Sequence, residues 1–119
     1  MSTEPNKFVI QKHTRDDEVH WDLMLEAGDC LQTWRLSKNP DEIVNQSAEA
    51  VKIFDHPLKF LTYEGPVNKG KGRVKIADAG TYEVMHENDE RIELDLLGQI
   101  LKGKFTLIHL KNDHWQFAP

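Results

Sequence analysis

Apolar residues recur at every second position along most of the chain, a pattern that indicates strands with one buried face. The alternation is clearest over residues 8–13, 19–26 and 33–37. Further strand-like runs cover residues 50–54, 73–77, 81–86, 91–96, 104–110 and 114–117. The chain is therefore predicted to consist mainly of short strands.

Turn-forming residues separate most of these runs, and little of the chain favours helix. The predicted turns contain Gly28 and Asp29, Ala79 and Gly80, Asn88 and Asp89, and Asn112 and Asp113. Residues 40–50 begin like a helix, at Pro40 and Asp41. Many short strands at close spacing predict an all-β, mainly antiparallel fold: a small closed or nearly closed β-barrel with at most one or two short helices. Closure removes the sheet edges that invite aggregation.

Composition narrows the class of protein. The 119 residues suit one domain, which we place at residues 8–119 after a flexible N-terminus at residues 1–7. With 15 Lys+Arg against 20 Asp+Glu, the net charge of −5 argues against a charge-driven nucleic-acid coat protein. The lone Cys30 excludes an internal disulfide, and no apolar run approaches the roughly 18–20 residues that span a bilayer. The opening MSTEPNK lacks a signal-peptide core, so we expect a cytoplasmic protein with no membrane partner.

Polar side chains that can bind a metal gather on the first two predicted strands. If residues 19–25 form a strand, His20 and Asp22 point to one face. Six residues connect His13 to His20, a length compatible with a hairpin loop. In a suitable register, Gln11 and His13 share the face of His20 and Asp22, and this set leaves coordination positions open for water or substrate. The competing interpretation is a solvated face with a surface ion pair.

The next hairpin adds a cation to this face. A two-residue turn at residues 28–29 pairs Leu23 with Trp34 on the core side. The same register places Arg35 opposite Asp22 on the polar face. Arg35 is therefore a candidate cation beside the predicted metal site, and a simple cross-strand ion pair with Asp22 is an equal alternative.

Three further features carry possible chemistry. His56 precedes Pro57 where an apolar run meets a loop, a usual place for a catalytic side chain, although a histidine before proline is also ordinary. Glu64 is a candidate partner for an imidazole. A basic run without acids could follow a phosphodiester backbone or, equally, protect a solvated edge strand. The run consists of Lys69, Lys71, Arg73 and Lys75.

The order of motifs from about residue 8 to residue 117 resembles the 3′-phosphoesterase domain of bacterial DNA ligase D, here as a stand-alone version. The motifs are QKH, HWDLMLE, LQTW, DHPL, YEG, GTYE and LKGKFTLIHL. The resemblance implies a small β-barrel with one divalent metal, preferably Mn²⁺, that removes a 3′-phosphate or 3′-terminal ribonucleotide from DNA or RNA ends in repair. The expected partners are nucleic-acid 3′ ends and a separate DNA ligase or polymerase that uses the resulting hydroxyl.

Carried over position by position, the resemblance implies metal ligands at His13, His20 and Asp22. It also implies that Gln11 and His56 contact the scissile phosphate.

The chain departs from the family at several substrate contacts. A phosphate-binding arginine is replaced by Met24, an aromatic hydroxyl by Phe60, and a longer loop by residues 69–72. The predicted register places Arg35 diagonal to Met24, within about 7–8 Å between backbones, so we predict that Arg35 replaces the lost arginine.

Two other functions fit parts of the pattern. The lost arginine allows a catalytically weakened or inactive barrel that binds nucleic-acid ends or a repair partner. Two histidines and one aspartate also resemble the iron site of a small non-haem oxygenase.

Overall fold

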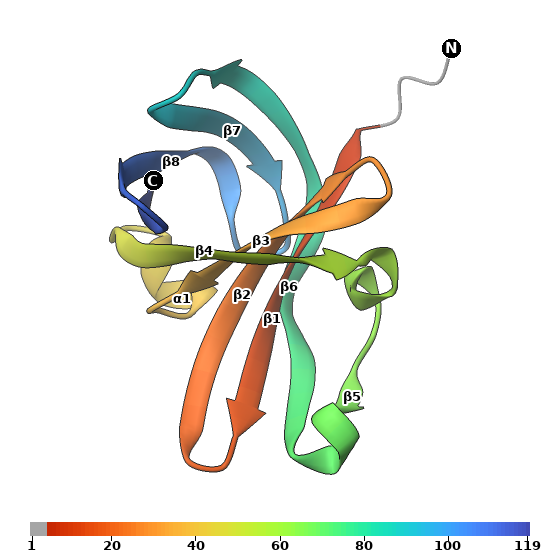
Figure 1. The fold of residues 1–119 in the computed structure, drawn as a ribbon. Coiled ribbons are helices and arrows are strands. Elements are labelled where there is room, and N and C mark those ends of the chain that lie inside the picture. Colours follow the sequence, from red (N-terminus) through yellow and green to blue (C-terminus); the bar gives the residue numbers. More distant parts are fainter. Residues whose placement is uncertain (1–4) are drawn as a thin grey trace.

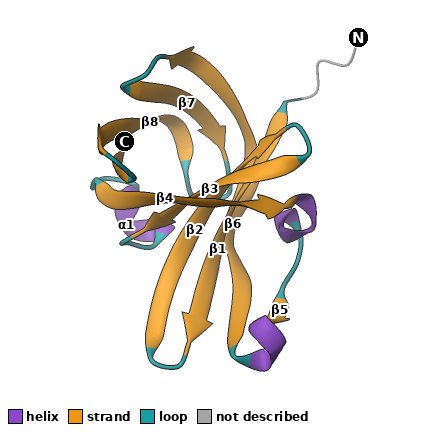
Figure 2. Ribbon diagram, in the orientation of Figure 1, coloured by secondary structure: helices purple, strands orange, loops and turns teal. Residues whose placement is uncertain are grey.

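The computed structural model describes residues 5–119, and its strands form one antiparallel sheet that closes on itself. The strands are β1 (Asn6–Arg15), β2 (Glu18–Ala27), β3 (Cys30–Leu36), β4 (Ala48–Pro57), β5 (Gly65–Val67), β6 (Gly72–Glu87), β7 (Arg91–Leu97), β8 (Lys102–Lys111) and β9 (His114–Ala118). The helices are α1 (Pro40–Ile43) and two single 3-10 turns, η1 (Leu58–Leu61) and η2 (Asn68–Gly70). Strand and loop dominate the chain (Figure 2).

The ring of strands runs β1-β2-β3-β4-β9-β8-β7-β6 and is closed by pairing of β6 with β1. The short strand β5 adds to the first residues of β6 on the side away from β1. The β1–β2 hairpin and the β5 segment project beyond the ring in the same direction (Figure 1). The predicted all-β, antiparallel barrel is confirmed.

The main core fills the inside of the ring. Phe8, Leu23, Trp34 and Phe117 are at most 1% exposed. The Phe117 ring stacks on Phe105 with centroids 5.4 Å apart. Burial of each such side chain stabilises the fold by about 1.5–3 kcal/mol, which makes this core the main source of stability.

A second apolar cluster lies on the outer face of the barrel. It contains Val9, Met24 and Leu31. The residues on either side of Val9 in β1 and of Met24 in β2 point into the main core. Leu58 and Leu61 of η1 pack against it. The strands β1 and β2 are therefore buried on both faces at this end, and η1 is fixed to the outside of the barrel.

The structure corrects one predicted turn. Ala79 and Gly80 lie inside β6 and pair with Val9 and Phe8 of β1. A Cβ atom at Gly80 would lie 1.9 Å from the Leu97 carbonyl oxygen. Glycine at this position permits close approach of two strands, which explains why the sequence looked like a turn.

Two boundaries also differ from expectation. The helix predicted within residues 40–50 ends at Ile43, because residues from Ala48 onward pair with β9. The predicted flexible N-terminus falls partly on residues 1–4, which lie outside the described residues. β1 already begins at Asn6 and pairs with β6 from there. No helix in the described part of the chain is long and apolar enough to cross a membrane.

A buried carboxylate fixes the loop between β7 and β8. Asp78 is 2% exposed, and its Oδ1 accepts hydrogen bonds from the backbone N–H groups of Ala79, Gln99 and Ile100. Its Oδ2 accepts the N–H of Leu101 at 2.9 Å. This carboxylate satisfies backbone donors that would otherwise be buried without partners.

We expect Asp78→Asn to lower the free energy of unfolding by about 1–3 kcal/mol, because the new NH₂ group faces a backbone donor. Urea denaturation measures the effect. Asp95→Asn, at an exposed position on β7, is the matched control and should change stability little. Equal stability of the two variants would show that the Asp78 network contributes nothing.

Candidate active site

The pairing of β1 with β2 brings the predicted metal ligands to one face. His13 lies opposite His20, and Gln11 lies opposite Asp22. The two strands remain paired almost to the hairpin tip, where a two-residue turn replaces the six-residue loop suggested by the sequence. Asp16 occupies this turn with a φ of 54°, a conformation that Asn and Asp tolerate better than most residues. The predicted common face is confirmed.

A cleft of about 370 Å³ opens on this outer face. Its walls come from β1, β2, β3, the end of β4, the segment that runs from η1 to η2, and the start of β6. The lining residues are Gln11, His13, Arg15, Glu18, His20, Asp22, Arg35, Phe54, His56, Pro57, Phe60, Val67, Asn68 and Val74. The cleft therefore contains every predicted metal ligand and every residue predicted to contact the scissile phosphate.

His13 has the properties of a neutral metal ligand. Its Nε2 atom is buried and makes no hydrogen bond with the described residues. Burial lowers the pKa of His13, and nearby Arg35 lowers it further while Asp22 partly opposes the shift. The imidazole is thus held in the uncharged form that metal coordination requires, with a nitrogen lacking a protein partner.

The other two predicted ligands engage neighbouring charges. Asp22 is 3% exposed, and its Oδ1 lies 3.3 Å from Nε of Arg35. Nε2 of His20 lies 3.6 Å from Oε2 of Glu18, and the His13 and His20 ring centroids are 6.4 Å apart. Among residues 5–119 no three His, Cys, Asp or Glu side chains already converge as a bound ion requires. The three side chains are adjacent in space, and binding of an ion would require them to converge further.

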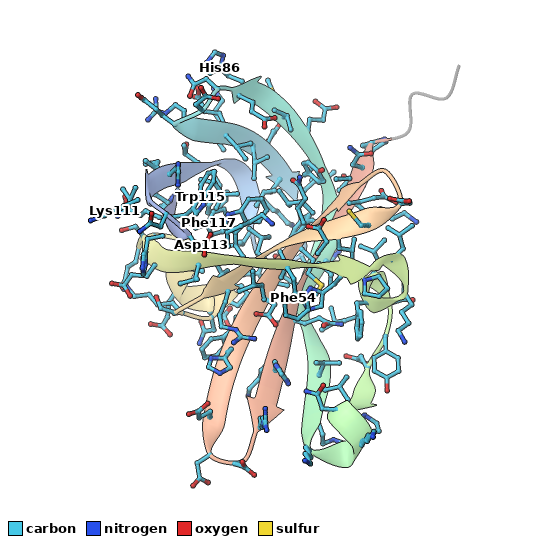
Figure 3. All side chains as sticks on the ribbon, viewed as in Figure 1. Phe54, His86, Lys111, Asp113, Trp115 and Phe117 are labelled. Atoms are coloured by element: carbon cyan, nitrogen blue, oxygen red, sulfur yellow. The ribbon has the colours of Figure 1, made fainter. Side chains whose placement is uncertain are left out.

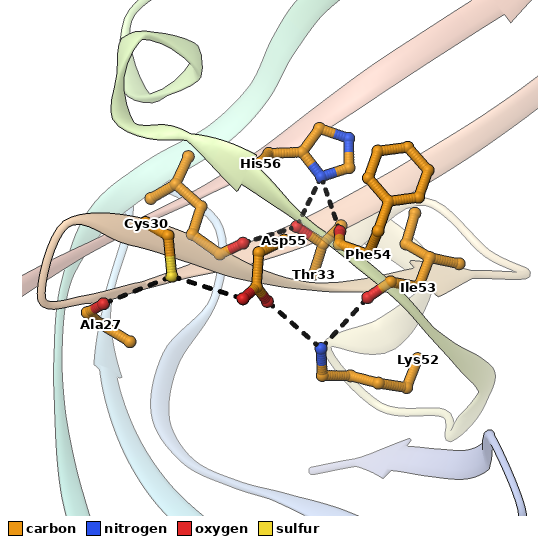
Figure 4. Close-up of polar contacts among 9 residues, drawn as sticks. Ala27, Cys30, Thr33, Lys52, Ile53, Phe54, Asp55 and His56 are labelled. Carbon is orange, nitrogen blue, oxygen red and sulfur yellow. Dashed lines mark hydrogen bonds and ion pairs between the residues drawn. The ribbon is translucent and has the colours of Figure 1, made fainter.

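The ring of His56 is fixed by its Nδ1 atom. Nδ1 lies 3.0 Å from the Phe54 carbonyl oxygen and 2.9 Å from Oγ1 of Thr33 (Figure 4). The Thr33 hydroxyl donates to the Leu31 carbonyl oxygen. Since a carbonyl can only accept, the hydrogen of the neutral ring belongs on Nδ1, and Nε2 is left free for chemistry in the cleft.

Gln11 acts as a structural tie at the floor of the cleft. Its Nε2 donates to the carbonyl oxygens of Phe60, at 2.9 Å, and Tyr63, at 3.1 Å. Both amide hydrogens are used, so they anchor the chain after η1 and have none left for a phosphate. The phosphate contact expected for Gln11 therefore has no free donor in this arrangement.

The positions at which the resemblance led us to expect departures from the family divide between the core and the cleft. Met24 is 1% exposed within the outer apolar cluster and does not line the cleft. Phe60 lines it and meets the His56 ring edge-on, with centroids 5.7 Å apart. Arg35 enters from β3, opposite Asp22 as the predicted register requires. A guanidinium is thus present in the cleft.

The basic run lies outside the cleft. Arg73 and Lys75 alternate with Val74 and line a separate groove with Lys12 on the other face of the β1–β6 pair. Lys69 lies within the η2 turn and Lys71 directly follows it, and Asn68 of the same turn borders the cleft.

Four residues in or near the cleft have positions that the sequence did not predict. Glu64 does not approach an imidazole; its Oε2 accepts the backbone N–H of Ile76 at 2.8 Å. Arg15 and Glu18 line the cleft because the hairpin is longer than expected. Phe54 reaches it through an irregular pairing that periodicity does not reveal.

Comparison with known proteins identifies the family. The profile of the DNA Ligase D 3′-phosphoesterase domain matches residues 11–109. The chain belongs to this family. It is 32% identical over 117 residues to the multifunctional non-homologous end joining DNA repair protein LigD of Mycobacterium tuberculosis, covering 92% of this chain and 15% of that protein.

Other family members have similar sequence identity to this chain. The LigD proteins of Mycolicibacterium smegmatis and Pseudomonas aeruginosa are 33% and 31% identical, over 92% and 90% of this chain. The chain spans about 15% of the length of the curated relatives it matches. The resemblance drawn from the motifs is therefore confirmed at the level of the 3′-phosphoesterase domain.

Proposed function

We propose that this protein is a manganese-dependent phosphoesterase that processes nucleic-acid 3′ ends during DNA repair. Its products would be ends freed of a 3′-phosphate or a 3′-terminal ribonucleotide, ready for a separate ligase or polymerase. Family membership supports the reaction class, and the names of the relatives supply the link to end joining. The observation that carries the proposal is the meeting of His13, His20, Asp22 and His56 in one cleft.

His13, His20 and Asp22 are the residues that would hold the cation. The unpartnered, neutral His13 nitrogen supports this assignment, and the buried Asp22 supplies negative charge beside it. Imidazole and carboxylate groups are suitable donors for Mn²⁺. When bound, such a cation would polarise a phosphoryl oxygen and lower the pKa of a bound water.

His56 would move the proton. Its Nδ1–H is held by the Phe54 carbonyl, so the exchangeable proton acts at Nε2. An imidazole can donate such a proton to the leaving oxygen near neutral pH. The fixed ring orientation keeps Nε2 available without a further rearrangement of the backbone.

Arg35 would stabilise the charge on the equatorial phosphoryl oxygens. Its Nε contacts Asp22, which leaves the terminal guanidinium nitrogens free for a phosphate. Charge stabilisation of this kind is the main demand of phosphoryl transfer. Lys69 and Lys71, beside the cleft border, would contact the nucleic-acid backbone. Arg73 and Lys75 would contact it on the other face of β6.

The decisive experiment measures phosphate release from a primer–template that ends in a 3′-phosphate. With Mn²⁺ the protein should release phosphate, and a chelator or His20→Ala should abolish release because the cation is lost. His86→Ala, outside the cleft, is the matched control and should retain activity. Binding without product would instead favour a module that only holds ends, the alternative suggested by Met24. If the protein neither binds the substrate nor releases phosphate, both functions are overturned.

His56→Ala should slow single-turnover phosphate release by about 10²–10⁴-fold, because proton donation to the leaving oxygen is lost. Calorimetric titration with Mn²⁺ should give unchanged affinity, because His56 is not among the proposed ligands. His114→Ala, an exposed histidine outside the cleft, should change neither measurement. A rate within a few-fold of wild type would remove His56 from the mechanism.

Arg35→Ala should lower kcat by about 10²–10³-fold, because a charge-stabilising donor is removed from the transition state. Affinity for Mn²⁺ should not fall, since Arg35 competes with the cation for the Asp22 carboxylate. Steady-state kinetics and Mn²⁺ titration separate the two effects. Unchanged turnover would reduce Arg35 to a structural ion-pair partner.

A further inference from the structure

Phe54 is an exposed aromatic side chain at the border of the cleft. It is 75% exposed, the most of any large apolar side chain among residues 5–119. Single exposed apolar residues are ordinary, so exposure alone assigns no role. Phe54 lies on β4 (Figure 3) and lines the cleft. The exposed residues Val84, Met85 and Leu97 lie on β6 and β7 and do not line it.

A local irregularity of β4 turns Phe54 toward the cleft. His56 pairs with Leu31 and Ile53 pairs with Thr33, so Gln32 alone opposes the two residues between them. This is a β-bulge, a feature that redirects side chains and is frequent beside active sites. The bulge places Phe54 and His56 together at the cleft border.

The Phe54 ring is held in a defined orientation. It stacks on the His56 imidazole with centroids 4.8 Å apart and an interplanar angle of 10°. The same imidazole is fixed by Thr33 and by the Phe54 carbonyl oxygen (Figure 4). One face of the phenyl ring is therefore covered, and its high exposure leaves the other face open to a planar ligand.

We infer that Phe54 binds the terminal base of the nucleic-acid substrate by stacking, an inference that rests on the proposed function. In a nucleotide, base and 3′-phosphate are attached to the same sugar, so a phosphate at His56 brings its own base to the neighbouring ring. Every base has a π face, so this contact tolerates any sequence. Phe54 is then a substrate-binding residue that sets a preference for ends with an intact terminal base.

The test compares two DNA oligonucleotides that end in a 3′-phosphate at one ionic strength. One carries adenine on its terminal nucleoside, and the other carries no base there. Phe54→Ala should lower kcat/KM for the adenine substrate by about 5- to 150-fold, mainly through KM. The abasic substrate should be cleaved equally by both proteins. Phe54→Trp should restore the preference, and Leu97→Ala, a similarly exposed apolar position outside the cleft, should change nothing.

The outcomes distinguish this inference from the proposed function. Equal losses on both substrates would show that Phe54 acts through His56, and no loss would show that it has no role. Either result overturns base stacking while the phosphoesterase stands. If the wild-type protein neither binds nor cleaves either substrate, the proposed function fails, and the stacking role fails with it.

Discussion

The register of β1 against its two neighbours determines both the barrel and the site. β1 pairs with β2 on one side and with β6 on the other, and the second pairing closes the ring. Because side chains alternate along a strand, a slip of one residue would turn His13 inward and expose Ile10. The same apolar burial that stabilises the barrel therefore fixes which polar groups face the cleft.

Polar groups on the outer face divide into those already satisfied and those left open. Gln11 uses both amide hydrogens to tie down the chain after η1, and His56 uses Nδ1 to fix its own ring. His13 keeps a buried nitrogen that has no hydrogen-bond partner among residues 5–119. A buried atom of this kind costs stability unless a ligand satisfies it. The cleft thus combines a rigid frame with one unsatisfied position, as expected where a ligand binds.

The sequence predicted the parts of the structure that depend on local signals. The turn containing Gly28 set the β2–β3 register and with it the Asp22–Arg35 pair, because a two-residue turn permits one pairing. The incorrectly predicted turn at Gly80 shows the limit of such signals, since glycine is needed there because the Leu97 carbonyl group of the neighbouring strand β7 approaches closely. Alternation along β2 also placed Met24 on the polar face, but it could not show that η1 packs over this residue and buries it.

The remaining features depend on contacts between segments far apart in the sequence. The packing of η1 on β1 and β2, the bulge before His56 and the Asp78 network each join elements that no local pattern relates. Such contacts are set by the closed barrel as a whole. The sequence therefore predicted the face that carries the proposed ligands. The rest of the cleft, formed by the end of β4 and the segment from η1 to η2, became visible only in the fold.

Met24 stands where the family resemblance leads us to expect an arginine, and its packing gives the apolar side chain a structural role. Met24 packs under η1, which begins directly after Pro57, and Phe60 of η1 contacts the His56 ring. An apolar side chain at this position stabilises the segment that holds His56 in the cleft. Arg35 places a positive charge in the cleft from β3, where its pairing with Asp22 needs no burial in the apolar cluster. Arg35 on β3 thus supplies positive charge to the cleft, and Met24 on the neighbouring strand β2 packs against η1.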